Sequence, residues 1–91
     1  MDMVDGKVII TNKLGLHLRA AALLVQAASA FKSDVHIRKN NTEVDAKSIM
    51  GVLGLEAAMG SELLVWADGE DEDDALRAVV GLVEAKFNEE E

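Results

Sequence analysis

Residues 13–21 read Lys13-Leu14-Gly15-Leu16-His17-Leu18-Arg19-Ala20-Ala21, and this stretch decides the fold. Upstream, residues 7–12 have the pattern of a strand whose start the sequence leaves open toward the N-terminus, and residues 13–15 have that of a turn. Downstream, apolar side chains recur with the spacing of one buried helix face: Ala21, Leu24, Val25, Ala28 and Phe31. An extended segment therefore gives way to an amphipathic helix at about Leu18, and a histidine lies at the junction.

The position of His17 has two interpretations. The first turn of a helix presents unpaired backbone N–H groups and the positive end of the helix dipole, which together form an anion site. A histidine there can carry a phosphoryl group without a metal, and Arg19 supplies a guanidinium for the same oxygens. In the alternative interpretation, His17 does no more than cap the helix.

A second motif lies about thirty residues further on, in residues 45–55. Ser48 directly precedes an apolar run, which is typical of a helix N-cap, and the helix is expected to end near Leu55. A helix this short cannot bury every side, and Val52 and Leu55 are expected in the core. The other apolar side chains are expected to face solvent as a docking patch, with core packing as the alternative: Ile49, Met50 and Leu53.

The remaining elements follow from periodicity and turn signals. Alternation predicts strands over residues 34–39, 43–46 and 62–68, the first two joined at Asn40-Asn41. The acidic run 71–74 is expected in the first turn of a last helix, in preference to a calcium loop. Its buried face is expected to hold Leu76, Val79, Val80, Val83 and Phe87. The pattern predicts an α+β fold of two layers, with helices on one face of an antiparallel sheet.

The period of two in residues 62–68 places Leu64 and Trp66 on the face away from the helices, with Ile9. Two interpretations stay open for this face: cross-strand pairing within the sheet, or a contact surface for a partner or a second copy. His36 alternates with apolar neighbours and is expected on the same open face.

Composition limits the classes of function. The 91 residues form one expected domain, residues 1–91, and the net charge of −8 argues against nucleic acid as a ligand. The chain has no cysteine, no apolar run long enough for a membrane span and no basic segment near Met1, so we expect a cytoplasmic protein. Residues 1–55 carry a charge of +2 and residues 56–91 one of −10. Three cations lie near the two motifs and would suit acidic partners: Lys13, Arg19 and Lys47.

The two motifs resemble those of the HPr family, the histidine-containing phosphocarrier proteins of the bacterial phosphotransferase system. That family carries Gly-(Leu/Ile)-His-Ala-Arg-Pro-Ala around its phosphorylated histidine and Lys-Ser-Ile-Met around its regulatory serine. The resemblance runs from about Lys7 to Phe87, and residues 10–15 and the acidic tail are similar to the nitrogen-related branch. It implies a βαββαβα sandwich with strand order 1-4-2-3 and three helices on one face.

Two positions depart from the family pattern. Leu18 stands where the family has alanine, and Ala20 stands where it has proline. Because Ala20 is a strong helix former, we expect the helix to persist with a less rigid entry turn and one more available N–H. The departures bear on partner choice and transfer rate rather than on the fold.

The resemblance implies a phosphoryl carrier rather than an enzyme, working without cofactor or metal. His17 would accept a phosphoryl group from phosphorylated enzyme I and pass it to an EIIA-type acceptor, with Arg19 stabilising the charge. HPr kinase/phosphorylase would act on Ser48, transcriptional regulators are further expected partners, and the protein is expected to be a monomer. Partner contacts are expected at Leu16, Leu18, Ala20, Lys47, Ile49, Met50 and Leu53.

Two alternatives remain at this point. One is a regulatory binding module read mainly through Ser48 phosphorylation, with little carrier traffic, although such a module would not require His17. The other is an interaction domain that is never phosphorylated, which only the composition favours.

Overall fold

The computed structural model describes residues 3–89 and has a βαββαβα order. Its elements are β1 (Val4–Ile9), α1 (Leu18–Ser29), β2 (Asp34–Lys39), β3 (Thr42–Asp45), α2 (Ile49–Gly54), β4 (Glu62–Asp68), α3 (Glu72–Glu84) and a 3₁₀ turn, η1 (Lys86–Asn88).

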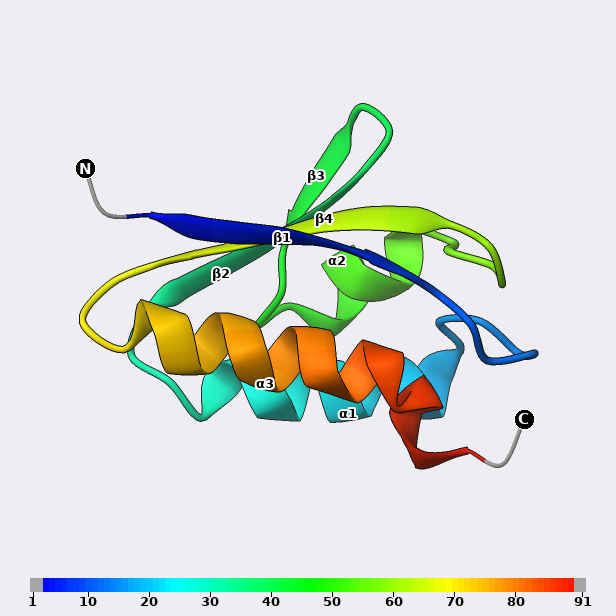
Figure 1. Ribbon diagram of the computed structural model, residues 1–91. Coiled ribbons are helices and arrows are strands. Elements are labelled where there is room, and N and C mark those ends of the chain that lie inside the picture. Colours follow the sequence, from blue (N-terminus) through cyan, green and yellow to red (C-terminus); the bar gives the residue numbers. More distant parts are fainter. Residues whose placement is uncertain (1–2, 90–91) are drawn as a thin grey trace.

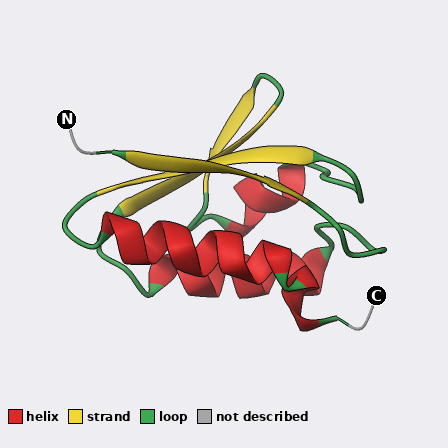
Figure 2. Cartoon of the chain, viewed as in Figure 1, coloured by secondary structure: helices red, strands yellow, loops and turns green. Residues whose placement is uncertain are grey.

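The four strands form one antiparallel sheet in the order β1-β4-β2-β3. The helices lie on one face of this sheet, where α1 and α3 run side by side, and the other face is open (Figures 1 and 2). The core fills the space between the layers, with alternate residues of β4 pointing into it: Leu63, Val65 and Ala67. The predicted two-layer α+β sandwich and its strand order are confirmed.

Strands β2 and β4 have the predicted bounds, whereas β1 begins and ends three residues earlier than predicted. The reason lies at Asn12, whose amide nitrogen donates to the carbonyl oxygen of Gly15 at 2.8 Å. The Gly15 N–H donates back to the carbonyl of Asn12 at 3.1 Å. These two bonds close a turn at residues 12–15, which leads into α1. Ile10 is outside β1 but still exchanges backbone hydrogen bonds with Gly60 and Ser61, at 2.7 and 2.9 Å.

The end of α3 differs from the prediction of one continuous helix through Phe87. The helix ends at Glu84, and Lys86, Phe87 and Asn88 have φ angles of 58°, 56° and 64°. This left-handed region costs non-glycine residues about 1–2 kcal/mol each. The Phe87 side chain is fully buried, and burying a phenylalanine side chain contributes roughly 1.5–3 kcal/mol. Phe87 therefore belongs to the core, as predicted, through a reversal of the chain rather than through helical periodicity.

The open face of the sheet carries the predicted aromatic side chain. Trp66 and Leu64 are half-buried and Ile9 is 50% exposed on this face. The Trp66 ring stacks on that of His36, its neighbour across β2 and β4, with ring centroids 5.3 Å apart. Cross-strand stacking therefore accounts for Trp66, and it also gives His36 a partner that the sequence did not indicate.

Asp71 connects the start of α3 to the segment before β2. Its carboxylate accepts hydrogen bonds from the backbone N–H groups of Lys32 and Ser33 and from the Ser33 hydroxyl. These bonds, the one from the Ser33 hydroxyl above all, lower the pKa of Asp71 to about 2. The acidic run therefore does more than begin a helix, because its first member fastens two loops together.

We expect Asp71 to make stability depend on acid. Because its folded-state pKa lies below the ordinary value of 3.8, its stabilising effect is present above that value and is lost as the pH falls toward 2. Asp71→Asn should unfold at a lower temperature than the parent at neutral pH, and the gap should narrow through this acid range. Thermal unfolding of both proteins at a series of pH values checks this. A gap that stays constant with pH would contradict the role assigned to the charge.

Candidate functional site

His17 occupies the N-cap position of α1 in extended backbone conformation, with φ −76° and ψ −179°. Its carbonyl accepts from the Ala21 N–H at 2.8 Å, which is the first bond of the helix. Its side chain makes no capping hydrogen bond, so helix capping does not account for the imidazole. Within residues 3–89, the N–H groups of residues 18–20 have no hydrogen-bond partner, as expected of a helix start. The histidine therefore stands beside free backbone donors.

The loop before His17 is held in place on two sides. Asn12 is fully buried and bonds to Gly15, as described above. The Leu16 N–H donates to the Ala57 carbonyl oxygen at 2.8 Å. Gly15 has φ +69°, and a Cβ atom there would lie 2.7 Å from that same oxygen. The approach of His17 to the helix start thus depends on a glycine and a buried amide.

Gly15→Ala is expected to lower the free energy of unfolding by about 1–3 kcal/mol, because the added methyl group collides with backbone atoms that cannot move away. Gly54→Ala is the matched control, since a Cβ atom there meets nothing within 4 Å. Denaturant unfolding of both variants measures the difference. Equal stability of the two variants would show that the loop adapts to a side chain.

Glu89 reaches the site from the far end of the chain. Its Oε2 accepts from the Nε2–H of His17 and from a terminal nitrogen of Arg19 at 3.2 Å. Its Oε1 accepts from the side-chain nitrogen of Asn12 at 3.0 Å. The Glu89 side chain is 7% exposed, against 25% for His17 and 63% for Arg19. The side chains of Asn12 and Arg19 thus hold the Glu89 carboxylate against the imidazole of His17.

These contacts lower the pKa of Glu89. The hydrogen bond from His17 is the largest cause, burial opposes it, and the bond from Asn12 and the nearby positive charges add to the lowering. Glu89 is therefore ionised at neutral pH. The acidic tail after Phe87 could not be placed at the site from the sequence. Its direction depends on the left-handed backbone of residues 86–88, and only Asn88 is of a type that favours that region.

Ser48 caps α2 as predicted. Its Oγ accepts from the Gly51 N–H at 3.1 Å. Lys47, beside it, donates from Nζ to the Phe31 carbonyl oxygen at 2.9 Å, so its ammonium group braces the segment after α1. Helices α1 and α2 pack against each other, which brings the two sequence motifs to neighbouring elements of one layer.

The apolar side chains among the predicted partner-contact residues divide into three groups. Leu18 and Met50 are 65% and 76% exposed, so they can meet a partner. Half-buried side chains of α2 pack partly against the core: Ile49 and Leu53. Leu16 and Ala20 are buried, and their assignment to the docking surface is wrong. Leu16 turns inward from the Gly15 turn, and Ala20 begins the buried face of α1 together with Ala21.

Two further observations concern the surroundings of the site. Val52 and Leu55 are buried in the core as predicted. Leu14, in the loop before His17, is 68% exposed and was not singled out from sequence. We define the site patch as the exposed apolar side chains Leu14, Leu18 and Met50.

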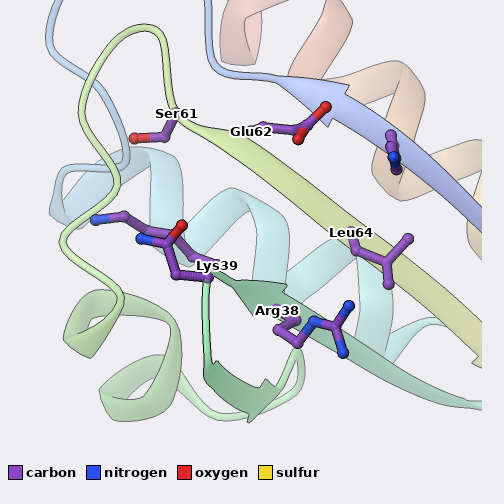
Figure 3. A pocket seen from close by; sticks show the side chains of 7 residues that line it. Arg38, Lys39, Ser61, Glu62 and Leu64 are labelled. Carbon is purple, nitrogen blue, oxygen red and sulfur yellow. The ribbon is translucent and has the colours of Figure 1, made fainter.

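The open face of the sheet carries a separate pocket of about 360 Å³ (Figure 3). It is lined by Lys7, Arg38, Lys39, Asn40, Ser61, Glu62 and Leu64. The Lys39 ammonium group, which belongs to this lining, is bound by the carbonyl oxygens of Leu55 and Glu56. No residue predicted for the site lines this pocket, so the histidine site lies elsewhere on the surface.

Within residues 3–89, no helix is long and apolar enough to cross a membrane. The same part of the chain contains no cluster of three or more potential metal-ligating side chains.

The fold and the histidine at a helix start define a class: small α+β proteins that present one imidazole beside the unpaired backbone N–H groups of a helix. The family model described as the PTS HPr component phosphorylation site matches residues 4–85. A phosphocarrier protein HPr from Xylella fastidiosa is 49% identical over 97% of this chain and 99% of that protein. One from Cupriavidus necator is 46% identical over 98% of this chain and 100% of that protein.

A solved structure of HPr from Thermoanaerobacter tengcongensis has a TM-score of 0.91 and 46% identity, covering 100% of both chains. The chain belongs to the HPr family, the phosphocarrier proteins of the phosphotransferase system.

Proposed function

We propose that His17 accepts a phosphoryl group from phosphorylated enzyme I and passes it to an EIIA-type acceptor protein. The observation that carries this proposal is the placement of His17 at the start of α1, with free backbone N–H groups beside it and a side chain that takes no part in capping. A neutral imidazole at this position is a nucleophile beside preorganised donors for the oxygens of the moving phosphoryl group.

Arg19 supplies mobile positive charge in this scheme. Its guanidinium is mostly exposed and makes one hydrogen bond to Glu89. Because a guanidinium presents several donors, Arg19 can bind phosphoryl oxygens without a large rearrangement of α1. Phosphoryl transfer is assisted mainly by positioning of the reactants and by stabilisation of charge. The backbone N–H groups at the start of α1 and the Arg19 guanidinium would provide both.

Partner proteins are proposed to dock on the site patch and on the exposed side of α2. This surface is apolar at Leu14, Leu18 and Met50, and it adjoins both His17 and Ser48 along the chain. Leu18 enlarges the apolar area relative to an alanine, which bears on the choice among acceptors. The single domain, residues 1–91, is proposed to act as a monomer in these encounters.

Phosphorylation of Ser48 is the proposed regulatory event, written by HPr kinase/phosphorylase. A phosphate there would gain favourable contact with the start of α2 and would place negative charge beside the docking surface. Transcriptional regulators are proposed to bind the protein when Ser48 is phosphorylated. A module that served regulation alone would have no use for the arrangement around His17, so we favour the carrier with Ser48 control.

A two-stage transfer tests the proposal. The protein is incubated with phosphoenolpyruvate and enzyme I, separated from both, and then mixed with an EIIA-type protein. We expect an acid-labile phosphate on the protein in the first stage and its loss to the acceptor in the second. A protein that gains no acid-labile phosphate in the first stage would contradict the carrier function.

A further inference from the structure

The carboxylate of Glu89 contacts Nε2 of His17, which leaves Nδ1 as the ring nitrogen open to a phosphoryl donor. The carboxylate meets Nε2, and Asn12 and Arg19 hold the carboxylate from its other sides. An ionised carboxylate only accepts hydrogen bonds, so the shared proton lies on Nε2, and an imidazole that becomes neutral in this contact keeps that proton. The lone pair of that imidazole then lies on Nδ1.

We infer that Glu89 is a positioning residue that fixes the proton of His17 on Nε2 and thereby makes Nδ1 the phosphoryl acceptor. The inference rests on the proposed function and adds a residue to it. Positioning of an imidazole by a carboxylate on its second nitrogen is a general way to select one tautomer and one ring orientation.

The phosphoryl group can be transferred to Nδ1 while the proton stays on Nε2. The Nδ1 lone pair forms the bond to phosphorus, and the bond from phosphorus to the donor breaks with its electron pair left on the donor. The ring then carries a positive charge, which the Glu89 carboxylate offsets at the Nε2–H. When the phosphoryl group leaves for the acceptor, the electron pair returns to Nδ1 and the resting state is restored.

The segment that carries Glu89 is built to hold it there. Three successive left-handed residues, 86–88, reverse the chain after α3, and the fully buried Phe87 anchors the reversal. The Glu89 N–H donates to the Lys86 carbonyl oxygen at 3.0 Å. Since Phe87 already fastens this end of the chain, the contacts of the Glu89 side chain are not needed to anchor it and are free to serve His17.

Arg19 donates to the same oxygen of Glu89 that contacts His17, and this has a consequence for transfer. In the resting state Glu89 holds the guanidinium within reach of His17. When a phosphoryl group arrives, its oxygens compete with Glu89 for Arg19, while the bond from Nε2–H to Glu89 stays. Glu89 thus keeps its hydrogen bond to the Nε2–H of His17, while Arg19 exchanges Glu89 for the phosphoryl oxygens.

The test compares Glu89→Gln with Glu84→Gln, which removes the same charge from an exposed position on α3. Two-bond ¹H–¹⁵N correlation spectra, recorded where the imidazole is neutral, report the tautomer of His17. We expect the Nε2–H form in the parent and in Glu84→Gln, and a mixture in Glu89→Gln, because an amide can accept from Nε2–H or donate to a bare Nε2. Phosphoryl transfer from enzyme I should slow about tenfold in Glu89→Gln alone.

Glu89→Asp separates charge from reach, since it keeps the carboxylate but is one methylene shorter. We expect its transfer rate to lie between those of the parent and Glu89→Gln. Unchanged tautomer populations and an unchanged rate in Glu89→Gln would overturn the inference. The tautomer measurement needs no phosphoryl donor, so a failure of the carrier function itself would appear separately, as a parent that enzyme I does not phosphorylate.

Discussion

His17→Ala is expected to lose all acid-labile phosphate after incubation with phosphoenolpyruvate and enzyme I, while the fold stays intact. The imidazole makes no capping bond and contacts the rest of the protein mainly through Glu89, so its removal leaves the core untouched. The phosphate that remains on the protein is measured after mild acid treatment and after neutral treatment, and the difference is the acid-labile phosphate. The circular dichroism spectrum checks the fold.

His36→Ala is the matched control for that experiment. It removes the second histidine, which stacks on Trp66 on the open face of the sheet, opposite the layer that contains α1 (Figure 1). Labelling should be unchanged in this variant. If His17→Ala were still labelled, or if His36→Ala lost its label, the assignment of the acceptor would be wrong.

Substitutions at Ser48 are expected to separate its structural role from its regulatory one. Ser48→Ala removes the acceptor for the Gly51 N–H and should cost about 0.5–2 kcal/mol of stability, with little effect on transfer. Ser48→Asp keeps a capping oxygen and adds negative charge beside the docking surface. Phosphorylation by enzyme I should then slow about tenfold, which corresponds to ~1.4 kcal/mol of lost interaction with an acidic partner.

Thr42→Asp adds the same charge at an exposed position on the edge strand β3 and serves as the control. Rates of phosphorylation at several ionic strengths complete the measurement, because a repulsion between charges weakens as salt is added. Equal rates for the parent and Ser48→Asp would contradict the proposed regulation.

Elements with a local signal could be predicted from the sequence. The alternation of residues 34–39 and 62–68 fixes two strands with their bounds, because each strand buries one face and ends at a turn. Ser48 before an apolar run marks the start of α2 correctly, since an N-cap is a local hydrogen bond. The place of His17 at the start of α1 was also predicted from a local signal, the change from a strand pattern to the apolar spacing of a helix.

Features that depend on chain reversals could not be predicted in this way. Leu16 follows a left-handed glycine, so its direction into the core is not a matter of periodicity. Glu89 reaches His17 across 72 positions of sequence because three non-glycine residues adopt left-handed conformations. Burial of Phe87 offsets part of that cost, and this contribution exists only once the core is assembled.

The location of the phosphoryl group on the protein tests the central claim most directly. The ¹⁵N-labelled protein is phosphorylated with phosphoenolpyruvate and enzyme I, and its phosphorus–nitrogen coupling is measured by NMR. We expect one phosphorus nucleus coupled to Nδ1 of His17, with the proton of that ring on Nε2 beside Glu89. A phosphate bound to any residue other than His17 would contradict it.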